Sequence, residues 1–220
     1  MKYVVVDLEM NPVSRKDFRE VKQKLNDEVI EIGAVKLDDA FRRESTFRRY
    51  VKPQYNTICR HITRLTGITQ ETVDGQEFFE PCFRAFVDWI GEEETKIYSW
   101  STSDISQLKH ECAYKLPSFD RNWLTSRWVD LQQKFDDRLG LYNNLALQYA
   151  LGAMNLEFKG TQHTALDDAI NTSEILVLMQ DDEKFRKTMQ PVIDILKPKE
   201  DLSSSIGDLC PELLELQKKL

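Results

Sequence analysis

The sequence predicts a layered α/β domain built on a mixed sheet. Segments with the apolar spacing of strands, at residues 2–8, 29–37, 43–51, 96–100 and 126–130, are interleaved with helical patterns at residues 79–90, 104–114, 143–151 and 165–180. Three strands joined by short connections precede the first long helix, so part of the sheet is expected to be antiparallel. A length of 220 residues, with 41% hydrophobic and 30% charged residues, suits one such domain with a sizeable core.

The first strand ends in two acidic residues. The apolar residues 3–6 lead into Asp7, Leu8 and Glu9. Because alternate side chains of a strand share a face, Asp7 and Glu9 present two carboxylates together. Such a pair suits hard divalent cations, which prefer oxygen ligands and often share their coordination sphere with substrate phosphates. Acidic residues also follow strands as solvated turn formers, so this pair alone does not establish a catalytic site.

Two basic clusters lie near the first three strands. One follows the first strand and contains Arg15, Lys16, Arg19, Lys22 and Lys24, and the other lies on a predicted hairpin and contains Arg42, Arg43, Arg48 and Arg49. Either cluster would suit contacts with phosphates, and a solvated helix or strand face is the alternative interpretation. The net charge of −7 argues against a broad basic surface for nucleic acid.

A third acidic position follows the fourth strand. Residues 96–100 have the pattern of a short buried strand, and Ser-Thr-Ser-Asp104 leads from it into an amphipathic helix. Asp104 therefore lies where a strand gives way to a helix. The same four residues also have the composition of a helix N-cap, which is the alternative role for Asp104.

The last strong pattern contains His163 and two aspartates. Residues 160–162 are typical of a loop, and apolar residues recur at helical spacing from Ala165 onward. Asp167 and Asp168 fall in the first helical turn, where the helix dipole favours negative charge. On local grounds the aspartates could equally be capping charges and His163 a surface histidine.

Together these residues resemble the DEDDh family of 3′-to-5′ exonucleases. Asp7 and Glu9 match its first motif, Asp104 its second, and His163 with Asp168 its third, whereas Asp167 lies beside the match. Residues 29–35 are similar to the family's second strand, and residues 51–53 with 65–69 are similar to its third strand and following loop. The resemblance covers residues 1–182. It looks closest to the KapD-like and RNA-interference or histone-mRNA exonuclease branch, although residues 7–10 also resemble oligoribonuclease.

The resemblance implies a ribonuclease-H-like exonuclease domain with a five-stranded mixed sheet flanked by helices. It implies hydrolysis of single-stranded RNA or DNA from the 3′ end to nucleoside 5′-monophosphates, with two Mg²⁺ or Mn²⁺ ions. Asp7, Glu9, Asp104 and Asp168 are the expected metal ligands. His163 is the expected general base, because an imidazole can accept a proton near neutral pH. The residues expected to contact the substrate are Leu8, Met10, Arg15, Lys16 and Arg19, and Met10 stands where many members carry Thr.

We expect the exonuclease domain at residues 1–182 and a helical C-terminal extension at residues 183–220. The regular pattern weakens after Asp181, where Pro191, Pro198 and a run of serines interrupt it, and residues 212–216 have the pattern of a short helix. This extension would pack on the domain or bind a protein partner. Four cysteines without a Cys-x-x-Cys pair indicate neither a zinc site nor disulfides. With no signal peptide or membrane-spanning pattern, we expect a cytoplasmic protein.

Two other functions fit the same residues. The chain would serve as a proofreading or processing subunit that acts mainly through assembly with a polymerase or a ribonucleoprotein. Alternatively, it would be a non-catalytic regulator that binds nucleic acid. The second alternative is disfavoured, because a pure binding module does not need several mutually repelling carboxylates at one place.

Overall fold

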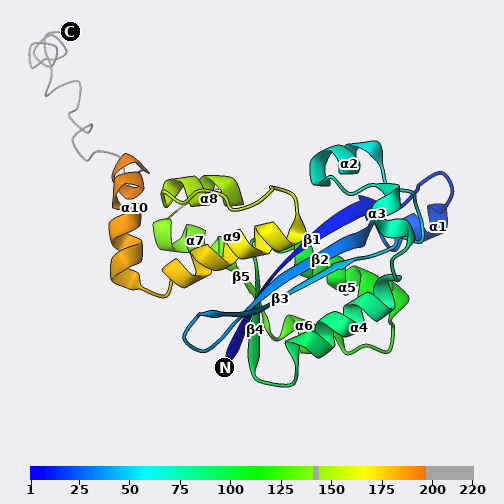
Figure 1. Cartoon of the computed structure of the whole chain (residues 1–220), viewed down its shortest axis with the longest axis horizontal. Helices are drawn as coiled ribbons and strands as arrows, with labels where there is room; N and C mark the ends of the chain where they lie inside the picture. The colour runs from blue at the N-terminus through cyan, green and yellow to red at the C-terminus, as the bar shows by residue number, and fades with distance from the viewer. Residues whose placement is uncertain (141–143, 197–220) are drawn as a thin grey trace, which may run out of the picture.

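A five-stranded mixed sheet forms the centre of the computed structural model, which describes residues 1–140 and 144–196. Its strand order is β3-β2-β1-β4-β5 (Figure 1). The strand β2 runs antiparallel to its two neighbours β1 and β3, and β4 and β5 run parallel to β1. The predicted fold class is confirmed. The strands are β1 (Lys2–Pro12), β2 (Asp27–Leu37), β3 (Arg43–Tyr50), β4 (Thr95–Ser99) and β5 (Trp128–Asp130).

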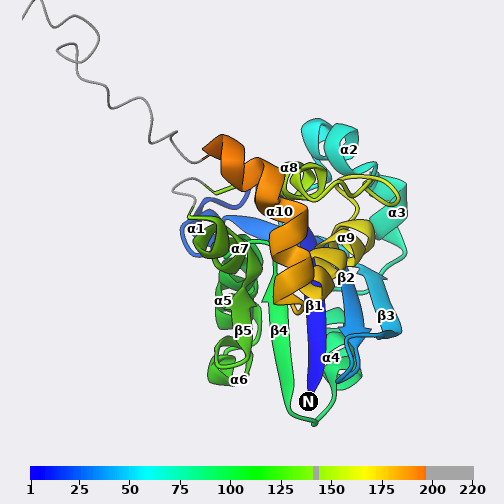
Figure 2. The same ribbon diagram turned by 90° about the vertical axis from the view of Figure 1, so that its left-hand side faces the viewer.

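Helices cover both faces of the sheet. The side chains of Val4 and Val6 pack in one core cluster with α4, α5 and α6, whereas Val5 packs in a second cluster with α7, α8, α9 and α10 (Figures 1 and 2). All three valines are fully buried, as expected for a central strand. The helices are α1 (Arg19–Lys22), α2 (Arg60–Thr66), α3 (Gln70–Asp74), α4 (Phe79–Ile90), α5 (Ser103–Lys115), α6 (Arg121–Thr125), α7 (Leu131–Leu139), α8 (Leu147–Ala153), α9 (Ala165–Leu178) and α10 (Asp182–Leu196).

Helix α10 differs from the sequence interpretation, which expected the regular pattern to weaken after Asp181. Residues 182–196 are helical, and Phe185 and Met189, spaced by four, are buried in the second core cluster. Pro191 lies inside this helix and removes one backbone donor without ending it. The predicted division at residue 182 stays a prediction. Residues 197–220, with the predicted helix at 212–216, lie outside the described residues.

Helix α9 crosses β2 in direct backbone contact at Gly33. A Cβ atom at this position would lie 2.1 Å from the carbonyl carbon of Ala165 and from the backbone nitrogen of Leu166. Only glycine permits so close an approach. Gly33 is also paired with Asp7 across the β1–β2 ladder. The contact therefore places the first turn of α9 beside Asp7 and Glu9. These two residues lie in the middle of β1, because the strand does not end at residue 8 as expected but continues to Pro12 in its ladder with β2.

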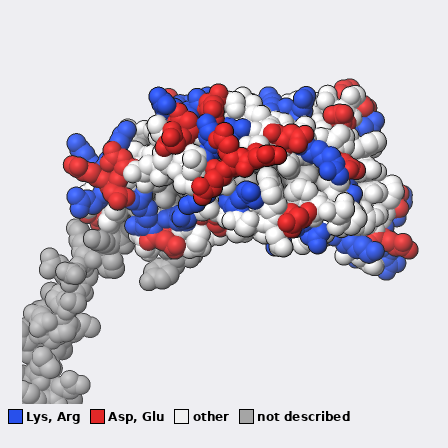
Figure 3. Space-filling view, turned by 90° about the horizontal axis from the view of Figure 1, so that it is seen from below, with Lys and Arg blue, Asp and Glu red and all other residues white. Residues whose placement is uncertain are grey.

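The outer surface is mixed in charge. On the face drawn in Figure 3, acidic and basic side chains are interspersed, and acidic groups gather near the middle. This view agrees with the expectation that the chain has no broad basic surface there. Over residues 1–140 and 144–196, no helix combines the length and the apolar character needed to span a membrane.

Candidate active site

The first two acidic residues lie on the face of β1 that α9 covers. Asp7 is paired with Gly33 and Glu9 with Glu31 across the antiparallel ladder to β2. On the other side, the parallel ladder between β1 and β4 ends at Val5, which is paired with Tyr98. Beyond Val5, β4 no longer supplies hydrogen-bond partners to β1. The backbone of β1 on that side is therefore available to other groups.

Asp104 binds to this part of the β1 backbone. It lies in the first turn of α5, it is 4% exposed, and its Oδ1 accepts a hydrogen bond from the Leu8 backbone N–H at 3.1 Å. The N-cap position of α5 is taken by Thr102 and not by Asp104. The carboxylate therefore points toward β1 between Asp7 and Glu9, and the simple capping role suggested by the local sequence is wrong.

His163 and Asp168 reach the site from the loop before α9 and from its first turn. His163 has a left-handed backbone with φ of 61°, which is unusual for a residue other than glycine. Glu9, His163 and Asp168 each offer one atom that could bind a metal ion, and these three atoms lie within 4.8 Å of one another. Asp167 is directed elsewhere, because its Oδ2 accepts the Thr161 backbone N–H at 2.9 Å. Asp167 thus holds the loop and stays outside the cluster, as the motif comparison predicted.

Burial and mutual repulsion raise the pKa values of these carboxyl groups. Burial, followed by the charges of the neighbouring carboxylates, raises the pKa of Asp7 well above its usual range. Burial is also the largest cause for the others: the pKa of Glu9 rises to about 8, that of Asp104 to about 7 and that of Asp168 to about 6. Such a cluster is unfavourable when fully ionised, so it favours the binding of a compensating positive charge.

Sequence reasoning missed Glu31, which lies at the edge of this cluster. Glu31 is fully buried, and its charge contributes to the raised pKa values of Asp7, Glu9 and Asp168. A signal was present, because Glu31 is the one charged residue within the apolar run of residues 29–35. A glutamate in a strand that is buried on both faces requires a specific partner.

The five predicted substrate contacts are not gathered at the carboxylates. The side chain of Leu8 is buried in the first core cluster, and Met10 packs against the same cluster, on the side of β1 opposite to α9. Arg15, Lys16 and Arg19 are exposed on the segment that follows β1, and Arg15 and Arg19 line a hollow of about 310 Å³. Contacts of these residues with a substrate stay predictions.

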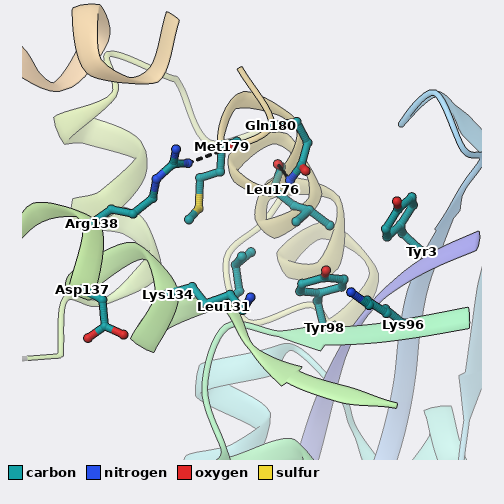
Figure 4. Close-up of a pocket in the computed structure, with 10 residues that line it drawn as sticks. All are labelled: Tyr3, Lys96, Tyr98, Leu131, Lys134, Asp137, Arg138, Leu176, Met179 and Gln180. Atoms are coloured by element: carbon teal, nitrogen blue, oxygen red, sulfur yellow. Dashed lines mark hydrogen bonds between the residues drawn. The ribbon is translucent and has the colours of Figure 1, made fainter. Parts of the chain in front are cut away.

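A larger hollow, of about 470 Å³, lies away from the predicted site (Figure 4). Its walls come from the starts of β1 and β4, from α7 and from the end of α9, and they include Tyr3, Lys96 and Tyr98. Arg138 at its edge donates a hydrogen bond to the Met179 carbonyl at 2.6 Å. This hollow contains none of the predicted site residues. The chemistry of the carboxylates and not the size of a cavity therefore identifies the candidate site.

A ribonuclease-H-like sheet with an acidic site on its central strand defines a class of proteins suited to phosphoryl chemistry. The family model described as RNase_T, exonuclease, matches residues 4–176. The chain belongs to this exonuclease family, and the resemblance to DEDDh exonucleases inferred from the motifs is confirmed.

Individual relatives agree with this family. The chain is 27% identical over 168 residues to 3′-5′ exoribonuclease 1 of Rattus norvegicus, covering 70% of this chain and 47% of the relative. It is 27% identical over 166 residues to the probable 3′-5′ exonuclease KapD of Bacillus subtilis (strain 168), covering 74% and 78%. The chain thus spans about half the length of exoribonuclease 1.

The fold is also similar to a solved structure. The nuclease domain of 3′hExo, described as a DEDDh family member bound to rAMP, superposes with a TM-score of 0.70 at 22% sequence identity. The superposition covers 82% of this chain and 92% of that domain. The similarity supports the assignment of the fold.

Proposed function

We propose that this chain is a 3′-to-5′ exonuclease that hydrolyses single-stranded RNA or DNA and releases nucleoside 5′-monophosphates. The observation that carries the proposal is the convergence of Asp7, Glu9, Asp104, His163 and Asp168, which are spread over 162 residues of sequence, around the middle of β1. Two relatives, 3′-5′ exoribonuclease 1 and the probable 3′-5′ exonuclease KapD, support the reaction class.

The donor set fits hard divalent cations. Carboxylate oxygens are the ligands that Mg²⁺ and Mn²⁺ prefer, and the raised pKa values show that the cluster gains from a compensating charge. Asp7, Glu9 and Asp168 would hold two such ions, with Asp104 completing the site. When bound, the ions supply electrostatic stabilisation of the charge that develops on the phosphate and on the leaving oxygen.

His163 is proposed as the general base. Its imidazole lies close enough to Glu9 and Asp168 to reach a water molecule beside a phosphate held at the carboxylates. His163 would take a proton from the attacking water as the new oxygen–phosphorus bond forms. The bond from phosphorus to the 3′ oxygen of the preceding nucleotide then breaks, and the terminal nucleotide leaves as its 5′-monophosphate.

Substrate binding is assigned to other parts of the chain. The exposed Arg15, Lys16 and Arg19 would contact phosphates farther along the strand. The packing of Leu8 and Met10 in the first core cluster speaks against contacts between their side chains and the terminal nucleotide. A protein partner at residues 183–220 stays a prediction, as does the cytoplasmic location.

A direct assay tests the proposal. The purified protein is incubated with single-stranded RNA or DNA labelled at the 5′ end, in the presence of Mg²⁺, Mn²⁺ or EDTA. We expect stepwise shortening from the 3′ end with either ion and none with EDTA. Asp7→Ala should abolish shortening and melt no lower than the wild type, because removing one of several repelling carboxylates relieves strain in the metal-free protein.

The matched control is Asp88→Ala, which removes an exposed aspartate from α4. It should retain wild-type activity. Undiminished shortening by the Asp7→Ala protein, after exclusion of a contaminating nuclease, would remove Asp7 from the site. No shortening of either nucleic acid by the wild-type protein would defeat the proposed function.

A further inference from the structure

Glu31 is a buried carboxylate that the proposed reaction does not use. Its side chain is 1% exposed and lies directly opposite Glu9 in the β1–β2 ladder. A buried charge is tolerated only when partners compensate for its lost hydration. Glu31 has two such partners: its Oε1 accepts a hydrogen bond from Arg48 Nε at 2.6 Å, and its Oε2 accepts one from the Ala165 backbone N–H at 3.3 Å.

The second partner is the first residue of α9. The first backbone N–H groups of a helix have no partner within the helix and are usually satisfied by the side chain of the N-cap residue. The N-cap of α9 is Thr164, and its side chain makes no such hydrogen bond. Glu31 supplies the acceptor from the sheet instead, and its negative charge also suits the positive end of the helix dipole.

The position of α9 is thereby fixed at two neighbouring points of β2. At Gly33 the backbone of the helix rests on the strand, and two residues earlier Glu31 holds the N–H of Ala165. His163 precedes Ala165 by two residues, and Asp168 follows it by three. The positions of His163 and Asp168, the two residues of the third motif, therefore depend on where Glu31 fixes the first turn of α9.

The side chain of Glu31 is itself fixed by Arg48. Arg48 is on β3, its Nη2 donates to the Tyr50 hydroxyl at 2.5 Å, and its guanidinium lies 4.9 Å from the centre of the Tyr50 ring. The planar guanidinium is thus fixed by Tyr50 on one side while its Nε binds the carboxylate. The chain of contacts runs from Tyr50 through Arg48 and Glu31 to the first turn of α9.

The geometry points to Glu31 and Arg48 as positioning residues that set the distance of His163 and Asp168 from Asp7 and Glu9 on β1. This inference rests on the proposed function, because it assigns these residues to the same site. In this role both residues would act through α9 and would not themselves bind the substrate or a metal ion. A displacement of about 1 Å in a catalytic group can lower a rate about 100-fold, so loss of this anchor has a measurable effect.

The test compares Glu31→Ala with Glu31→Gln. The glutamine keeps an oxygen that can accept the Ala165 N–H, but its amide is a poor ligand for Mg²⁺ or Mn²⁺. We expect Glu31→Ala to lower kcat about 10- to 100-fold with little change in KM, and Glu31→Gln to restore most of that loss. Arg48→Ala should lower kcat in the same direction, and the double variant Glu31→Ala with Arg48→Ala should be no worse than Glu31→Ala alone.

A matched control separates positioning from general destabilisation. Glu111 is also a buried glutamate that pairs with a cation, Lys115 at 2.7 Å, and accepts a backbone N–H from β2, that of Val29 at 2.9 Å. Glu111→Ala should destabilise the fold as Glu31→Ala does, yet keep kcat at temperatures where both variants are folded. Equal losses of kcat in the two variants would reduce Glu31 to a structural residue and overturn the inference.

Calorimetric titration with Mn²⁺ alone gives a readout that does not depend on catalysis. We expect weaker Mn²⁺ binding in Glu31→Ala, because Asp168 moves, and recovery in Glu31→Gln with unchanged stoichiometry. Loss of a bound ion in Glu31→Gln would show that Glu31 is itself a ligand and would overturn the positioning role. A wild-type protein that binds Mn²⁺ but cleaves no nucleic acid would defeat the proposed function, while the titration would still decide the role of Glu31.

Discussion

Replacing Gly33 by alanine tests how closely the site depends on the contact between α9 and β2. The added Cβ would lie 2.1 Å from the backbone of Ala165 and Leu166, whereas carbon atoms in good contact are about 3.5–4.0 Å apart. The obstructing atoms are backbone, so no side chain can rotate away. The first turn of α9 must therefore retreat from the sheet by about 1.5 Å.

This retreat has two consequences of different size. Overpacking of this kind lowers the free energy of unfolding by about 1–3 kcal/mol, which corresponds to a decrease of roughly 2 to 12 °C in the melting temperature of a domain of this length. The same retreat carries His163 and Asp168 away from β1, and a shift of this size lowers the rate about 100-fold. We therefore expect a folded protein with a severe loss of single-turnover cleavage.

The measurements are thermal melting and single-turnover cleavage at saturating substrate, both below the melting temperature of the variant. Gly152→Ala is the control: an added Cβ at this position in α8 meets no atom within 4 Å, and alanine favours a helix over glycine. That variant should melt at or slightly above the wild-type temperature and keep full activity. A Gly33→Ala protein with the melting temperature and cleavage rate of the wild type would refute the reasoning.

Three further predictions concern the chemistry, the substrate and the pH dependence. His163→Ala should lose about 10²- to 10⁴-fold in single-turnover rate, the usual contribution of a positioned proton acceptor, and should bind Mn²⁺ as the wild type does in calorimetry. Replacing Arg15, Lys16 and Arg19 together by alanine should weaken nucleic-acid binding and flatten its salt dependence, since fewer counterions are released, and should leave the rate at saturation unchanged. In metal-free buffer, the melting temperature should fall as the pH rises toward 8, because burial raises the pKa of Glu9 from 4.5 to about 8 and the folded protein then holds a proton that the unfolded chain releases. Mg²⁺ should oppose this fall.

Each of these three predictions has an outcome that contradicts it. Loss of Mn²⁺ binding in His163→Ala would make His163 a ligand instead of a base. An unchanged salt slope in the triple variant, or an equal change when the exposed Lys184, Arg186 and Lys187 of α10 are replaced, would leave the segment after β1 as solvated surface. A melting temperature with the same pH dependence in Glu9→Gln as in the wild type would show that this carboxylate does not cause the fall.

The sequence predicted the elements whose signal is local. All five strands and helices α4, α5 and α9 have regular apolar spacing. Asp7 and Glu9 lie within the first of these strands, and Asp104, His163 and Asp168 lie at or just before the starts of α5 and α9. A helical extension is expected after residue 182, but the regular course of α10 through Pro191 is not, because its apolar face becomes visible only when Phe185 and Met189 meet the core. Local patterns do not record which distant surface an element will cover.

The supporting residues of the site depend on contacts that no local pattern contains. The role of Glu31 requires Ala165, which is 134 residues away, and the importance of Gly33 requires the same turn of α9. The neighbours of Asp104 alone also suggest a helix cap, whereas the partner of its carboxylate is the Leu8 N–H, 96 residues away. The residues proposed to carry the chemistry are thus predictable from their spacing, and those that place them become visible only in three dimensions.

The crossing of α9 over β2 also determines when the site is complete. Asp7 and Glu9 leave the ribosome before His163 and Asp168, which follow more than 150 residues later in the chain. A nascent chain that ends before residue 165 has Asp7, Glu9 and Asp104 but neither residue of the third motif. Cleavage would thus begin only after Asp168 has been synthesised and α9 has docked on Gly33.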